Sequence, residues 1–83
     1  MTKQALDTIV TKHHWILLED IHDQLLYTMP TDETSFVSII FQNDEKIIVS
    51  IPLKEKTYQY KTIFYSVDKA TEYIDQRLYE YNN

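Results

Sequence analysis

The 83-residue sequence contains no glycine and no cysteine. Glycine is needed where a backbone approaches a phosphate closely or takes a positive φ. Its absence therefore excludes a P-loop, a dinucleotide-binding glycine-rich turn, an EF-hand loop and a glycine-flanked nucleophilic serine. Without cysteine the chain cannot form a disulfide, a thiol nucleophile or a zinc–thiolate centre.

Long hydrophobic runs are also lacking, because no apolar segment approaches the roughly 18 residues of a membrane span. The first residues lack the basic region and following apolar stretch that mark a signal peptide. These features predict a cytoplasmic protein that does not bind membranes. The length and a hydrophobic content of 43% predict a single globular domain over residues 1–83.

The chain is acidic, with a formal net charge of −5 at pH 7. Lys and Arg are absent between residues 19 and 33, where five acids form a candidate acidic patch. This balance argues against direct nucleic-acid binding, which needs a basic face, and the seven tyrosines do not change that expectation. The acids of this patch are Glu19, Asp20, Asp23, Asp32 and Glu33.

Apolar residues at helical spacing predict a helix at each end of the chain. The first is expected from Thr2 to about His13, and the last from Ser66 or Asp68 onward. The first stripe comprises Leu6, Ile9, Val10 and His13, and the second comprises Val67, Ala70, Ile74, Leu78 and Tyr81.

Between the helices the apolar period changes to two, which predicts strands. Residues 14–29 fit a helical stripe as well, so they could instead extend the first helix. The expected fold is α+β: an N-terminal helix, an antiparallel β-meander of three to five strands and a C-terminal helix, with the helices mainly on one face. The expected strands are His14–Glu19, Gln24–Met29, Ser35–Gln42, Lys46–Leu53 and Tyr58–Ser66.

The register follows from which residues alternate on each strand. A three-residue connection, 43–45, places Ile39 opposite Val49 and both in the core, with Asp44 or Glu45 in a left-handed conformation. An even connection around residues 55–56 then aligns the next strand. The expected core face is Val37, Ile39, Phe41, Ile47, Val49, Ile51, Leu53, Tyr58, Tyr60 and Phe64.

The opposite sheet face carries the residues we expect to contact a partner. Three isoleucines on adjacent strands, Ile40, Ile48 and Ile63, form an apolar group that a solvated surface does not need. Tyrosine beside such a group is typical of protein interfaces. The expected interaction residues are Ile40, Ile48, Ile63, Tyr65, Phe36 and Lys61.

The histidines raise an enzymatic alternative. His13, His14, His22 and Asp23 could bind zinc or manganese and support a metal-dependent hydrolase. No established metal-binding spacing is present, so we expect neither a metal nor another cofactor. His22 is expected to lie in an exposed turn between acids.

The sequence favours a small acidic, non-enzymatic protein-interaction module. Its partner is expected to be another protein or a second copy in a homo-oligomer. By compositional analogy, such a chain suits an inhibitor or adaptor encoded by a phage or another mobile element. The alternative is an acidic nucleic-acid mimic that antagonises a DNA- or RNA-binding protein through residues 19–33.

Overall fold

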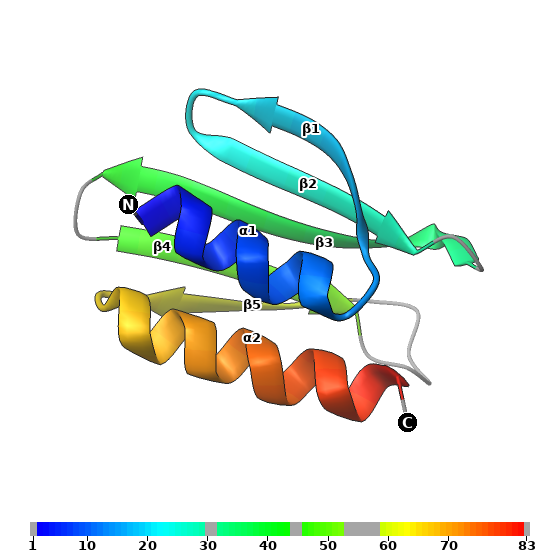
Figure 1. The fold of residues 1–83 in the computed structure, drawn as a ribbon. Helices are drawn as coiled ribbons and strands as arrows, with labels where there is room; N and C mark the ends of the chain where they lie inside the picture. The colour runs from blue at the N-terminus through cyan, green and yellow to red at the C-terminus, as the bar shows by residue number, and fades with distance from the viewer. Residues whose placement is uncertain (1, 30–31, 44–45, 53–58, 83) are drawn as a thin grey trace.

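The chain folds into a five-stranded antiparallel sheet with two helices on one of its sides (Figure 1). A computed structural model describes residues 2–29, 32–43, 46–52 and 59–82. Consecutive strands are neighbours, in the order β1-β2-β3-β4-β5, which confirms the predicted α+β meander. In chain order the elements are α1 (Thr2–Lys12), β1 (Ile16–Ile21), β2 (Gln24–Met29), β3 (Asp32–Asn43), β4 (Lys46–Pro52), β5 (Gln59–Phe64) and α2 (Val67–Asn82).

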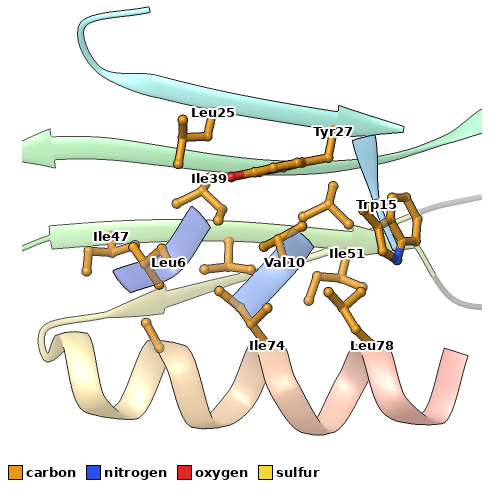
Figure 2. Close-up of a cluster of buried hydrophobic side chains, with 13 residues drawn as sticks. Leu6, Val10, Trp15, Leu25, Tyr27, Ile39, Ile47, Ile51, Ile74 and Leu78 are labelled. Atoms are coloured by element: carbon orange, nitrogen blue, oxygen red, sulfur yellow. The ribbon is translucent and has the colours of Figure 1, made fainter. Parts of the chain in front are cut away.

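The hydrophobic core lies between the sheet and the helices, as Figure 2 shows. Both predicted helical stripes face it: Leu6 and Val10 of α1 and Ile74 and Leu78 of α2 are fully buried. Helix α2 begins where predicted, because the Ser66 hydroxyl accepts a hydrogen bond from the Lys69 amide at 3.4 Å. The buried hydrophobic residues of the sheet are Leu25, Tyr27, Val37, Ile39, Ile47, Val49 and Ile51, with Phe41 and Phe64 packed beside them.

The predicted register of the central strands is confirmed. Ile39 lies opposite Val49, and Phe41 lies opposite Ile47. On the other side of β4, Ile47 pairs with Phe64 and Ile51 pairs with Tyr60. Leu53 and Tyr58, the side chain of Tyr60, and the loop residues Asp44, Glu45, Glu55 and Lys56 lie outside what the structure describes.

The connection from β3 to β4 differs from the prediction. Asn43 still belongs to β3 and pairs with Lys46, and the register shifts between Phe41 and Asn43. The extra residue that keeps Phe41 and Ile47 on one face is therefore supplied by a β-bulge rather than by a three-residue loop. A bulge allows two residues of one strand to oppose one of the next.

The prediction of residues 14–29 as two strands is confirmed over the helical alternative, but β1 begins two residues later than expected. His14 is not in a strand: it has φ 70°, the one positive φ among the described residues. The His14 amide donates a hydrogen bond of 3.0 Å to the Thr11 carbonyl, and this bond closes the turn that follows α1. Glycine usually occupies this position after a helix, because it has no Cβ to clash there.

Replacing His14 with glycine is expected to raise the free energy of unfolding by about 1 kcal/mol, since the left-handed conformation strains residues with a Cβ. Urea denaturation of the variant would measure the gain. His22→Gly is the matched control: His22 is also exposed, but it has no positive φ, so glycine there adds only flexibility to the unfolded chain. Equal effects at both positions would contradict the role given to His14.

Candidate functional site

The side of the sheet that faces away from both helices is called the open face here. Cross-strand partners share a face, so the pairing connects residues of all five strands into a continuous line. This isoleucine row consists of Ile21, Gln24, Ile40, Ile48 and Ile63, from β1 to β5. Ile21 is 49% exposed and Ile63 is 47% exposed at the two edges, while Ile40 and Ile48 are half-buried between them.

A second line of residues runs beside the isoleucine row on the open face. This mixed row consists of Glu19, Leu26, Ser38, Ser50 and Lys61. Its two edge residues are exposed and carry opposite charges: Glu19 on β1 and Lys61 on β5. Among the described residues neither forms an ion pair within the chain. The open face is therefore apolar in one row and charged with opposite signs at the ends of the next.

The remaining predicted interaction residues lie at the margins of these rows. Phe36 pairs with Thr28, which pairs with Ile16, so all three share the open face beyond the mixed row. Phe36 and Ile16 are both exposed. Tyr65 is 72% exposed, but it lies in the bend after β5 instead of in the strand, because β5 ends at Phe64.

Strand β1 contributes apolar surface that the sequence reasoning did not include. All six of its residues are exposed, among them Ile16, Leu17, Leu18 and Ile21. Natural edge strands are normally protected by charges or bulges, and β1 has both in Glu19, Asp20 and its register shift, but its aliphatic side chains remain exposed. The signal was present in the sequence as ILLEDI, but a register shift between Leu17 and Glu19 breaks its alternation.

The described residues of the predicted acidic patch do not all lie on one side of the sheet. Glu19 lies on the open face, whereas Asp20 pairs with Leu25 on the side of the helices. There Asp20 forms a salt bridge with Lys3, whose ammonium also donates to the Ile21 carbonyl at 2.6 Å. Asp23 is exposed beside the β1–β2 turn. The side chains of Asp32 and Glu33 lie outside the described ones.

A small open hollow of about 290 Å³ lies where α1 meets β1 and β2. Its carboxylates already have partners: Asp20 binds Lys3, and Asp7 accepts a hydrogen bond of 2.6 Å from the Tyr27 hydroxyl. Burial and the neighbouring Asp7 carboxylate raise the pKa of Tyr27 above its ordinary value of 10.0. These bonds hold α1 on the sheet. The hollow is lined by Lys3, Gln4, Asp7, Asp20 and Leu25.

The histidines proposed as metal ligands are not brought together. His13 is buried and lies 2.7 Å from a carboxylate oxygen of Asp75 on α2, so it links the two helices. His14 is in the exposed turn after α1, and His22 is in the turn after β1. Over the described part of the chain, no three histidine or acidic side chains gather as metal ligands would.

The contact between His13 and Asp75 has an electrostatic consequence. The hydrogen bond from His13 is the largest influence on Asp75 and lowers the pKa of that carboxyl, with Lys12 at 3.4 Å adding to the effect. Asp75 thus remains ionised and holds His13 and Lys12 at the end of α1. A histidine and a carboxylate in contact resemble part of a hydrolytic site; here the pair joins the end of α1 to α2.

Comparison with known proteins assigns no function: no family model, no curated protein and no solved structure matches this chain. Among the described helices, none is both long and apolar enough to cross a membrane. The open face, with its isoleucine row and oppositely charged edges, is therefore the candidate functional site that the geometry itself supports.

Proposed function

We propose that this protein is a non-enzymatic interaction module that binds another protein surface through the open face. The observation that supports this proposal most directly is the isoleucine row, which crosses all five strands on the side that neither helix covers (Figure 1). Burying an aliphatic side chain stabilises a complex by roughly 1.5–3 kcal/mol. The four isoleucines of this row would therefore contribute substantially to the free energy of binding.

The proposed module acts in the cytoplasm as an inhibitor or adaptor, whose effect comes from occupying a surface of its target. A rigid sheet suits this role, because its side chains are positioned before binding and little entropy is lost on association. The alternative of nucleic-acid mimicry receives less support, since Asp20 is already bound to Lys3 on the other side of the sheet from Glu19.

The test is Ile48→Glu, which places a charge in the middle of the isoleucine row. We expect the variant to keep its circular dichroism spectrum, because Ile48 lies outside the core, and to bind its partner at least about 10-fold more weakly. Binding would be measured by sedimentation of the pure protein and by capture from host extract. Gln76→Glu, on the exposed side of α2, adds the same charge and should bind as the parent does.

An Ile48→Glu variant that is folded and associates as well as the parent would contradict the proposal. If Ile48→Glu does not fold, Ile63→Glu decides the question, since Ile63 is on an edge strand and 47% exposed. Unchanged association in a folded Ile63→Glu would place the binding surface elsewhere.

A further inference from the structure

We infer that the surface bound by the open face is a second copy of this chain, stacked face to face around a two-fold axis that runs along β3. This inference rests on the proposed function and names its partner. The arrangement is a closed dimer with a self-complementary interface. Two sheets stacked in this way interdigitate their side chains at a separation of about 10 Å, as in a β-sandwich.

The size of the open face fits a whole sheet as its partner. Five strands spaced about 4.8 Å apart and about six residues long give a face of roughly 24 by 20 Å. A stable interface buries about 800 Å² of accessible surface on each partner. The projected area of this face is about 480 Å², so a partner must cover it from β1 to β5 to make a stable interface, which a second sheet does.

The charges at the ends of the mixed row select this axis. A two-fold axis along the middle strand, β3, exchanges the two edges and places β1 of one copy over β5 of the other. Residues remain in their own row, so Glu19 of one copy faces Lys61 of the second copy, and the reverse contact is identical. Both side chains are exposed and lack an ion-pair partner among the described residues, so both are available for this contact.

The isoleucine row is matched by the same operation. Ile40 on β3 lies over Ile40 of the second copy, and Ile21 at one edge lies over Ile63 at the other. Beyond this row, Asp23 lies at the same end of the sheet as Phe41, whose amide donates to the Asp23 carbonyl at 2.8 Å. Lys46, the first residue of β4, also lies at that end, and the two-fold rotation places it beside Asp23 of the second copy. Ile21, Ile40 and Ile63 thus meet isoleucines, Ile48 meets the amide side chain of Gln24, and each of the four charged residues named here faces an opposite charge.

A two-fold axis across the strands is disfavoured by the same charges. It would stack β1 of one copy over β1 of the other and β5 over β5. Glu19 would then approach the acidic β1 edge of the second copy, and Lys61 would approach β5 of the second copy, which carries the other Lys61. Like charges brought together in an interface oppose association strongly. The opposite charges of the two edges therefore distinguish one stacking from the other.

The test uses two charge reversals, Glu19→Lys and Lys61→Glu, each purified separately. In a dimer of either variant both edge contacts join like charges, and we expect self-association to weaken by on the order of 10-fold or more. In an equimolar mixture one chain carries lysine at both positions and the other carries glutamate at both. Opposite charges then meet at both edges, so sedimentation of the mixture should show the dimer again at the parent's concentration range.

Lys69→Glu and Glu72→Lys are the matched controls, because both residues are exposed on α2 and lie outside the open face. Each should dimerise like the parent, and mixing them should change nothing. A parent chain that stays monomeric, or a mixture of the two edge variants that stays monomeric, would overturn the inference. In that case the capture experiment decides about the proposed function. If Gln76→Glu binds a different protein and Ile48→Glu does not, the proposed function is retained and only the second copy is rejected as the partner.

Discussion

Replacing Ile39 with alanine is expected to lower the free energy of unfolding by roughly 2–5 kcal/mol. Ile39 is fully buried at the centre of β3, where it lies between Leu25 of β2 and Val49 of β4. The loss combines the apolar surface returned to water with the cavity left among neighbours that relax only partly. Since small domains are stable by only about 5–15 kcal/mol, this single change removes a large share of the total.

The neighbouring Ile40 is the matched control, because it has the same side chain on the same strand but faces the other side of the sheet. Ile40 pairs with Ile48 on the open face and is half-buried. Ile40→Ala is expected to cost under about 1 kcal/mol when the protein is dilute enough to be monomeric. Urea denaturation of both variants measures the difference. Equal losses, or a larger loss at Ile40, would mean that the two faces of the sheet are assigned wrongly.

The contrast between these two isoleucines was predictable because side chains in a strand alternate strictly. Once Ile39 is placed opposite Val49, alternation assigns the faces of the side chains from Phe36 to Phe41 on β3 and from Lys46 to Pro52 on β4, and it fails only at the bulge before Asn43. The same rule placed Ile63 on the open face through the pairing of β4 with β5. Candidate residues on these three strands could therefore be named before the structure was known.

Strand β1 shows where this reasoning stops. Ile16 and Glu19 face the same side of the sheet although they are an odd number of residues apart, since a bulge at Leu18 shifts the register. Alternation read from the sequence would put them on opposite faces. A bulge depends on how the strand pairs with β2, and no residue type marks it in this glycine-free chain, so the fourth isoleucine of the row, Ile21, was missed.

Contacts between distant parts of the chain were also beyond sequence reasoning. His13 meets Asp75 across 62 residues, and Tyr27 meets Asp7 across 20. Each contact depends on how a helix is docked on its neighbours, which local periodicity does not determine. The histidines that sequence alone grouped as metal ligands are therefore separated by the fold, whereas a tyrosine that attracted no attention proves to be fully buried.

Stability is expected to fall in alkaline solution because of that buried tyrosine. Tyr27 has a pKa above its ordinary value of 10.0. The main cause is burial, which disfavours the charged phenolate, and the second is the hydrogen bond that the neutral hydroxyl donates to the Asp7 carboxylate. A pKa raised in the folded state stabilises the protein fully below pH 10. Above it the unfolded chain loses a proton that the native chain keeps, so stability declines as pH rises, by up to about 1.4 kcal/mol per pH unit.

Tyr27→Phe separates this effect from other alkaline titrations. At neutral pH the variant should lose about 1–3 kcal/mol, since the hydrogen bond to the Asp7 carboxylate is removed. Above pH 10 the loss should shrink, because phenylalanine has no proton to release on unfolding. Tyr79→Phe is the control: Tyr79 is 64% exposed on α2, so its removal should leave the alkaline slope almost as in the parent. Urea denaturation across this pH range would reject the assignment if the slopes of parent and Tyr27→Phe were parallel, because the ionisation of Tyr27 would then not be linked to folding.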